Sequence, residues 1–298
     1  MTGWVRGAAG GALSLLGAFA LYQATCAAWS EASSFRPRRG RVPVPRELAG
    51  LASVRDVSFP ARSGTIRGWL LPSRNGAAVV LVHGSDCNRA CVAAEARRLA
   101  DAGFGALLFD WPGRGESDGR VTFGRNELSA IRAAIEFIRA QPDTDPDRVG
   151  ALGVSAGASL LVMEAARDAS VRALVLVSPF ADSDAQTRSE FATWGPLTQW
   201  PALLVDRLLM PDGPVRVVEF ARALRRTAFL VVAGDRDPVV PLSASEEVYR
   251  AAPEPKKLLI LPSAHHADFG ALEPGAYGEQ IVAWFQAGLA GVSVSPSP

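Results

Sequence analysis

The residues with the clearest chemical potential lie in the stretch "GVSAG", where Ser155 stands between Gly153 and Gly157. A strand-like apolar run precedes this serine and a helix-like run follows it, which predicts a sharp strand-to-helix turn. A serine at such a joint can simply be a helix N-cap. The two glycines indicate more, because a strained turn of the G-x-S-x-G type lacks room for Cβ atoms and lifts the serine hydroxyl above the sheet. Ser155 is therefore a candidate nucleophile.

A serine nucleophile needs a base to take its proton and an acid to hold that base. The chain has three histidines: His83 comes before the serine, and His265 and His266 come after it. In hydrolases with this turn the chain order is Ser, then an acid, then His, which only the late pair satisfies. Asp235 and Asp237, in "GDRDPVVP", are the candidate acids.

The elements that must position these residues follow an alternating pattern. Short apolar runs alternate with amphipathic helical runs, which is typical of a parallel sheet between layers of helices. We predict eight strands, at residues 55–59, 66–71, 78–83, 106–110, 148–154, 173–177, 228–233 and 257–261. We predict helices at residues 89–102, 125–140, 156–169, 241–251 and 277–289. The first two strands are close enough for a hairpin, so the sheet is expected to begin antiparallel and become parallel.

A long insertion between residues 179 and 227 has helical stretches of its own. In an open α/β sheet such an excursion lies beyond the carboxyl ends of the strands, where ligands bind, so it is expected to cap the site. Its large apolar residues are candidates for an acyl pocket or for packing between the cap and the body: Phe180, Phe191, Trp194, Trp200, Leu203, Leu204, Leu208, Leu209 and Met210.

These motifs together resemble the α/β-hydrolase superfamily over about residues 52–290, and are similar to its membrane-anchored esterase and serine-aminopeptidase-like (lysophospholipase-like) branch. The resemblance implies the α/β-hydrolase fold, an eight-stranded, mostly parallel sheet flanked by helices, with a helical cap at about residues 180–227. The family's acid stands in a G-x-x-D-x-x-V-P pattern, which Asp237 matches, leaving Asp235 as a turn residue. The family's histidine matches His266, while His265 occupies the place that usually holds glycine.

The resemblance also implies an oxyanion hole made of two backbone N–H groups. One belongs to the residue after the nucleophile, here Ala156. The other comes from the loop after the third strand, where "LVHGSDC" resembles the family's H-G-x loop and points to Ser85. His83 and Gly84 would then shape that loop without transferring protons. The segment "FDWPGRGESDG" resembles the family's D-x-x-G-x-G-x-S segment and is expected to form a tight loop beside the site.

The N-terminal segment raises a separate question. No charged residue occurs between Gly7 and Trp29, and 23 helical residues reach roughly 34 Å, enough for a hydrocarbon core of about 30 Å. Residues 1–30 are therefore predicted to be a single-pass membrane anchor, with a cleaved signal segment as the alternative. Arginines at residues 36–41 place the catalytic domain on the cytoplasmic side, with export as the alternative. Residues 31–51 are predicted to be an Arg/Pro-rich linker, and residues 291–298 a disordered tail.

Composition excludes several classes of protein. With 298 residues, 48% of them hydrophobic, the chain can bury a full-sized core. The net charge is +1 and the arginines are scattered, which argues against nucleic-acid binding. Cys87 and Cys91 are predicted to be small buried hydrophobes on one helix face, not a disulfide or a zinc site. We expect no metal and no cofactor, and the sequence leaves the oligomeric state open.

The sequence predicts a serine hydrolase that cleaves carboxylic esters, acyl or lipid-like, through a Ser155–His266–Asp237 triad and an acyl-enzyme. Peptidase or amidase, thioesterase and acyltransferase activities use the same residues and remain open. A non-catalytic, ligand-binding member of the fold is a further alternative, because fold alone does not fix function.

Overall fold

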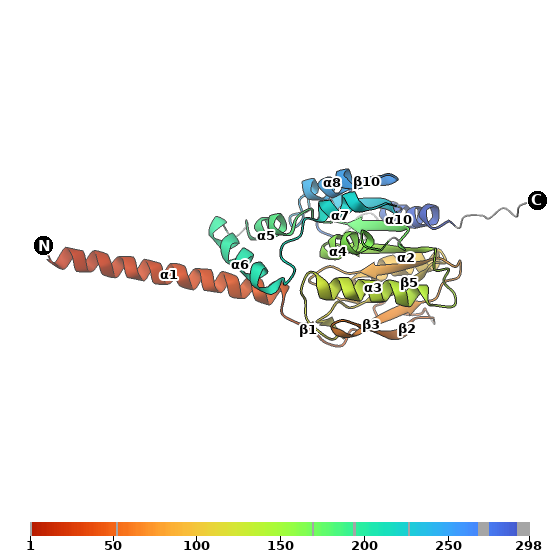
Figure 1. The fold of residues 1–298 in the computed structure, drawn as a ribbon, viewed down its shortest axis with the longest axis horizontal. Helices are drawn as coiled ribbons and strands as arrows, with labels where there is room; N and C mark the ends of the chain where they lie inside the picture. Colours follow the sequence, from red (N-terminus) through yellow and green to blue (C-terminus); the bar gives the residue numbers. More distant parts are fainter. Residues whose placement is uncertain are drawn as a thin grey trace, which may run out of the picture.

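The computed structural model describes residues 2–51, 53–168, 170–192, 195–225, 227–267 and 274–290. An eight-stranded sheet of order β10-β9-β8-β7-β4-β5-β3-β2 forms its centre (Figure 1). The strands are β2 (Arg55–Ala61), β3 (Gly64–Leu71), β4 (Ala78–Val82), β5 (Gly105–Phe109), β7 (Val149–Val154), β8 (Ala173–Val177), β9 (Ala228–Gly234) and β10 (Lys256–Leu261). β3 runs antiparallel to both of its neighbours and the other pairs are parallel. The predicted α/β-hydrolase sheet is confirmed.

Helices cover both faces of the sheet. One face packs against α3 (Arg125–Arg139), α4 (Ala156–Ala165), α7 (Val217–Ala223) and α8 (Leu242–Ala251), and the other against α2 (Ala93–Asp101) and α10 (Pro274–Gly288). Side chains of a strand alternate between faces, so Val80 joins the first core and Val79 the second, and both are fully buried. This double burial explains why the central strands are apolar throughout.

Two predicted helices differ from the structure. The helix predicted at 89–102 is a 3₁₀ turn, η1 (Arg89–Val92), followed by α2. The helix predicted at 156–169 ends at Ala165, and residue 169 lies outside the described residues.

The insertion between β8 and β9 forms α5 (Ser183–Ala192), η2 (Pro196–Thr198) and α6 (Gln199–Leu209), followed by α7. α5 and α6 lie at the end of the sheet where the parallel strands finish (Figure 1). Trp194, one of the apolar residues predicted for this segment, lies outside the described residues, as do residues 268–273 and the predicted tail at 291–298.

The N-terminal segment is one long helix, α1 (Thr2–Ser34), which projects from the body and packs along α6 (Figure 1). Ala27 and Phe35 contact Val205 and Met210, and Gln23 Nε2 donates to a cap carbonyl at 2.9 Å. Among the described residues, no helix combines the length and the apolarity needed to cross a membrane. The predicted single-pass anchor is therefore not supported.

The chain leaves α1 and returns to the body through a small parallel ladder. β1 (Arg38–Arg39) pairs with β6 (Arg114–Gly115), which lies in the loop after β5. Part of the segment predicted to be a linker is thus hydrogen-bonded to a loop beside the site.

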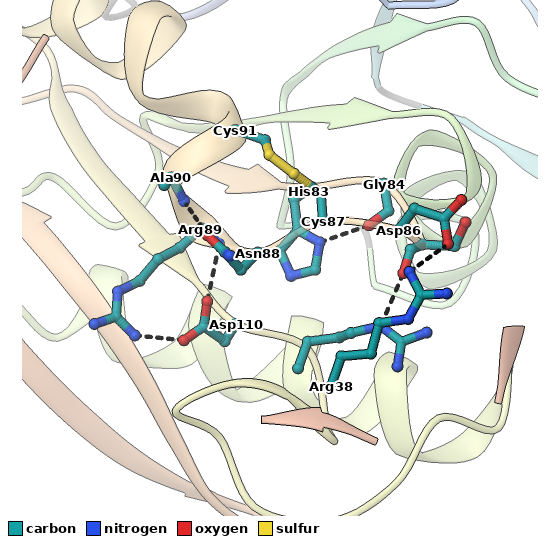
Figure 2. The surroundings of a disulfide bond; sticks show 12 residues. Arg38, His83, Gly84, Asp86, Cys87, Asn88, Arg89, Ala90, Cys91 and Asp110 are labelled. Atoms are coloured by element: carbon teal, nitrogen blue, oxygen red, sulfur yellow. Dashed lines mark hydrogen bonds and ion pairs between the residues drawn. A yellow bond between two sulfur atoms is a disulfide. The ribbon is translucent and has the colours of Figure 1, made fainter. Parts of the chain in front are cut away.

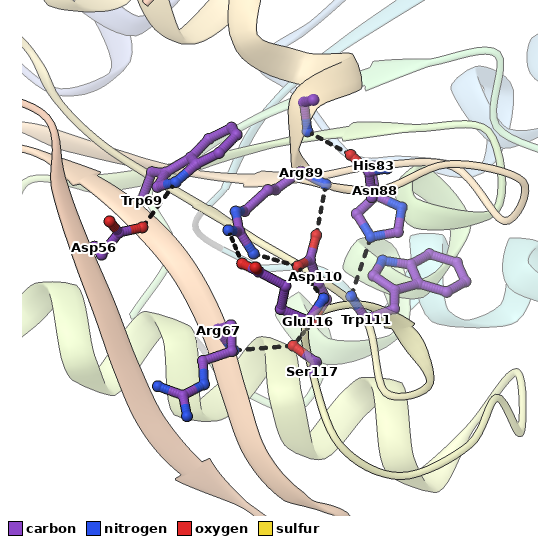
Figure 3. Close-up of polar contacts among 11 residues, drawn as sticks. Asp56, Arg67, Trp69, His83, Asn88, Arg89, Asp110, Trp111, Glu116 and Ser117 are labelled. Carbon is purple, nitrogen blue, oxygen red and sulfur yellow. Dashed lines mark hydrogen bonds and ion pairs between the residues drawn. The ribbon is translucent and has the colours of Figure 1, made fainter. Parts of the chain in front are cut away.

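A buried ionic cluster holds the loop after β5 in place (Figure 3). The Arg89 guanidinium contacts the carboxylates of Asp110 and Glu116 and lies 4.4 Å from the ring centroid of Trp69. Asp110 also accepts the backbone N–H groups of residues 89 and 116, at 2.8 and 2.9 Å. The loop turns so tightly that a Cβ on Gly115 would lie 2.2 Å from the Asp110 carboxylate. The D-x-x-G-x-G-x-S segment therefore folds around this carboxylate.

Replacing Arg89 with Met is expected to lower the free energy of unfolding by about 3–5 kcal/mol, because it leaves the buried Asp110 carboxylate without its cation. Arg97→Met is the matched control, since Arg97 pairs with Asp101 on the surface and such pairs contribute about 0.2–1 kcal/mol. Urea unfolding of both variants measures the difference. Equal losses would show that the cluster does not stabilise the loop.

Candidate active site

Ser155 occupies the joint between β7 and α4 in a strained backbone conformation, with φ at 55° and ψ at −126°. Its N–H donates to the Val177 carbonyl at 2.7 Å, which ties the turn to the neighbouring strand. A Cβ on Gly153 would lie 2.7 Å from the backbone of α4, and a Cβ on Gly157 would lie 2.3 Å from the His83 carbonyl. Close packing of backbone against backbone therefore requires both glycines of the motif.

Two loops that are distant in the sequence meet at this serine. His266, after β10, has Nε2 3.0 Å from the Ser155 Oγ and Nδ1 2.7 Å from Asp237 Oδ2. Asp237, after β9, accepts the N–H groups of Val239 and Val240 on its other oxygen, each at 2.9 Å. An ionised carboxylate can only accept, so Nδ1 of the ring carries the proton and Nε2 is left to accept from the serine hydroxyl.

The environment of Asp237 keeps it ionised. Its side chain is 1% exposed, and burial by itself raises the pKa of the carboxyl. The hydrogen bond and charge of His266, with the two backbone N–H groups, outweigh burial, so the pKa lies below its ordinary value. Ser178 adds a fourth donor, with its Oγ 2.9 Å from Asp237 Oδ2.

The alternative acid and base lie elsewhere in the same loops. Asp235 accepts the Ser263 N–H at 2.7 Å, which joins the loop after β9 to the loop after β10. Gly234 allows that approach, because a Cβ there would lie 2.3 Å from the Ala264 carbonyl. The His265 side chain is exposed, and His266 is the histidine in hydrogen-bonding contact with Ser155.

His83 orients the loop after β4. Its Nε2 accepts the Trp111 N–H at 3.0 Å (Figure 3), and its Nδ1 lies 2.6 Å from the Gly84 carbonyl (Figure 2). An N–H can only donate and a carbonyl can only accept, so the proton of the ring is on Nδ1. The peptide bond after Gly84 is trans, hence the N–H of Ser85 points away from the carbonyl that His83 holds. Ser85 lines both cavities that contain Ser155.

Burial keeps the His83 ring uncharged by lowering its pKa from 6.5 to about 3. The hydrogen bond to Gly84 opposes this shift, and the nearby Arg114 charge adds a smaller lowering. The second candidate donor, the N–H of Ala156, belongs to the first residue of α4 and so has no carbonyl partner within the helix.

Comparison with known proteins identifies the family of this chain. Residues 73–225 match the model of the family described as serine aminopeptidase, S33. The chain is 33% identical over 236 residues to the uncharacterized protein Rv2307c of Mycobacterium tuberculosis (strain H37Rv), across 76% of this chain and 77% of that protein. The chain belongs to the serine aminopeptidase S33 family.

This S33-family chain is similar to one further protein in sequence and to a solved structure in fold. It is 28% identical over 241 residues to the uncharacterized protein YfhR of Escherichia coli (strain K12), across 77% of this chain and 80% of YfhR. The solved structure of the Pyrococcus furiosus esterase Pf2001 superposes with a TM-score of 0.71 at 18% identity, covering 86% of this chain and 98% of that one. The latter likeness shows the shared α/β-hydrolase fold.

The two cysteines depart from the prediction, because Cys87 and Cys91 form a disulfide across the turn after Ser85 (Figure 2). The two cysteines do not share a helix face, because the helical segment begins at Arg89: Asn88 caps η1 by accepting the Ala90 N–H at 3.0 Å. Cys87 therefore precedes the helix, and its Cα lies 6.3 Å from that of Cys91. Both residues line the larger cavity beside the nucleophile.

Two cavities meet at Ser155 in this hydrolase-family fold. The larger measures about 600 Å³ and includes His266, while the smaller measures about 70 Å³ and lies under the cap. Of the apolar cap residues, Phe180 and Met210 line the smaller cavity and Phe191 lines the larger. Leu203 is buried. Three other apolar residues of the cap are exposed to solvent: Trp200, Leu204 and Leu208.

The cap also contributes carboxylates that the motifs did not indicate. Glu190 and Asp206 line the smaller cavity, and burial raises the pKa of both. Gln186 Nε2 donates to Glu190 at 2.8 Å, and Thr187 Oγ1 donates to Asp206 at 2.6 Å. The sequence could have indicated Glu190 and Asp206 as acidic residues in a segment expected to cap the site. It could not show that these two acids face the cavity, because that depends on the fold of the cap.

We expect the His83 ring to remain neutral far below the pKa of an ordinary histidine. In NMR spectra its Cε1–H signal, assigned with a His83→Gln variant, should keep a constant shift from pH 8 to about 5. The unfolded chain protonates this ring near 6.5, so its burial lowers the free energy of unfolding as pH falls from about 6.5 toward 3. A midpoint between pH 6 and 7 for this signal would contradict the proposed tautomer.

Proposed function

We propose that the chain is a serine hydrolase that cleaves carboxylic esters, with Ser155 as nucleophile, His266 as general base and acid, and Asp237 as the group that orients His266. The observation that carries the proposal is the continuous line of hydrogen bonds from the serine hydroxyl through the imidazole to the buried carboxylate, at 3.0 and 2.7 Å. Membership of a hydrolase family supports the same reaction class.

The reaction follows from these positions. The Ser155 Oγ attacks the acyl carbon while its proton moves to the His266 Nε2, and the C–O bond to the alcohol then breaks. His266 gives that proton to the departing alcohol oxygen, leaving an acyl-serine. Water, activated by the same nitrogen, attacks the acyl carbon and restores the free hydroxyl. Asp237 stays ionised throughout and stabilises the imidazolium that forms in each half-reaction.

The developing oxyanion requires fixed donors, and the backbone N–H groups of Ser85 and Ala156 are the candidates. His83 supports this role by holding the Gly84 carbonyl at 2.6 Å, which sets the orientation of the next N–H. Loss of one such donor typically costs about 2.7–4 kcal/mol of transition-state stabilisation.

Part of the lining of the smaller cavity suits the hydrocarbon groups of an ester. Phe123, Leu160, Met163 and Phe180 contribute apolar surface beside the nucleophile. Burial of hydrocarbon against this surface is favourable.

Replacing Ser155 with Ala is expected to lower kcat/KM for p-nitrophenyl acetate by about 10⁴-fold or more, because no nucleophile remains. It should also abolish labelling by a fluorophosphonate probe. Ser243→Ala, at an exposed serine on α8, is the control and should retain both activities. Retained hydrolysis by Ser155→Ala would sink the proposal.

The two adjacent histidines allow a direct test of the base. His266→Gln should lower kcat for p-nitrophenyl acetate by about 10³-fold or more, since the serine proton then has no acceptor. His265→Gln should retain most of the activity, because its ring is exposed and His266 contacts the serine. The reverse result would assign the base to His265.

A further inference from the structure

The C-terminal end of α1 forms part of the wall around Ser155. Three of its residues line the larger cavity: Trp29, Ser33 and Ser34. Ser34 also lines the smaller cavity. The N-terminal helix thus contributes to the candidate active site, although it lies outside every motif that identifies the family.

Arg114 fixes this end of α1 to the body. Its side chain is buried, and its guanidinium donates to three backbone carbonyls. Nη2 reaches the Ser34 carbonyl at 2.8 Å, and Nη1 reaches that of Arg36 at 2.7 Å. Nε reaches the Ser85 carbonyl at 2.8 Å. The last carbonyls of a helix lack partners within it and attract cations, so one arginine joins α1 to the loop beside the nucleophile.

Arg38 forms a second, more exposed link between the same two segments. Its Nη2 donates to the Ser33 carbonyl at 2.7 Å, and its Nη1 pairs with Asp86 at 3.1 Å (Figure 2). The position of α1 relative to the nucleophile is therefore set by two contacts on one loop.

An apolar groove lies between α1 and the cap. It measures about 270 Å³ and is lined by Tyr22, Thr25, Cys26, Trp29, Phe191 and Thr198. Trp29 and Phe191, whose rings lie edge to face with centroids 4.9 Å apart, line both this groove and the larger cavity. The groove therefore adjoins the cavity that contains Ser155 and His266.

The position of His266 indicates which half of an ester enters this groove. The departing alcohol oxygen takes its proton from His266, so the alcohol lies on the side of that ring. His266 lines the larger cavity, which adjoins the groove at Trp29 and Phe191. The acyl group must then occupy the smaller cavity, whose volume of about 70 Å³ accommodates roughly five groups the size of water.

We propose that the groove between α1 and the cap binds the hydrocarbon chain of the substrate's alcohol half, so that the preferred substrates are short-acyl esters of long-chain alcohols. The inference rests on the proposed function, in which Ser155 and His266 cleave the ester. In that cleavage the bond between the acyl carbon and the alcohol oxygen breaks, the alcohol leaves with a proton from His266, and the short acyl group remains on the serine.

Two isomeric esters test the orientation. Decyl acetate and ethyl decanoate contain the same atoms, but the ten-carbon chain is on the alcohol half of the first and on the acyl half of the second. We expect kcat/KM, measured by pH-stat titration on the full chain, to be at least about tenfold higher for decyl acetate, since each methylene matched to a pocket contributes at least about that factor. Equal or reversed values would overturn the inference.

A filled groove should remove the preference. Cys26→Phe places a ring in the groove and is expected to lower the ratio of kcat/KM for decyl acetate over ethyl acetate about tenfold or more. Ala24→Phe adds a similar ring at an exposed position of the same helix and should leave this ratio unchanged. Unchanged ratios in both variants would remove α1 from the substrate site.

Product inhibition provides a second measurement that does not depend on the long-chain ester. 1-Decanol should compete with ethyl acetate in the original chain, and Cys26→Phe should raise its inhibition constant about tenfold.

Fluorophosphonate labelling separates the two proposals. A chain that labels and cleaves ethyl acetate without preferring decyl acetate contradicts only this inference, whereas a chain that neither labels nor cleaves any ester contradicts the proposed function as well.

Discussion

The turn at Ser155 is the constraint on which the arrangement of this site depends. Its backbone passes so close to α4 and to the end of β4 that neither flanking position has room for a Cβ. That close packing forces the serine into a strained conformation and directs its side chain to the edge of the sheet where six parallel strands end. The loops after β9 and β10 then need only short excursions to bring a carboxylate and an imidazole to the hydroxyl.

Two buried titratable side chains near this turn, Asp237 and His83, have opposite charge states: one is ionised and the other is neutral. Asp237 is buried but ionised, because donors surround it, and His83 is buried and uncharged, because burial outweighs its hydrogen bonds. The first group supports a positive charge that appears on its neighbour, whereas the second holds a peptide group in a fixed orientation. Each polar side chain is given a single protonation state by its partners, which keeps the site ready without reorganisation.

The sheet could be predicted closely because its strands are apolar on both faces, a local signal, and each predicted boundary lies within two residues of the structure. The proximity of His266 and Asp237 to Ser155 followed from chain order and motif resemblance. Glu190, Arg114 and the end of α1 could not be predicted, because their places depend on how the cap and the N-terminal helix fold over the sheet. The Cys87–Cys91 disulfide was missed because both cysteines were assigned to one helix face, whereas Cys87 precedes η1 and Cys91 lies within it.

The buried guanidinium of Arg114 has a practical consequence for anyone who shortens the chain. Starting expression after residue 36 would delete two of the three carbonyls that this cation contacts. The buried Arg114 guanidinium would then keep only one of its three carbonyl partners, that of Ser85 in the loop beside Ser155. The end of α1 therefore helps to hold the loop beside Ser155 in place. A shortened chain would differ from the full chain at this loop as well as at its N-terminal end.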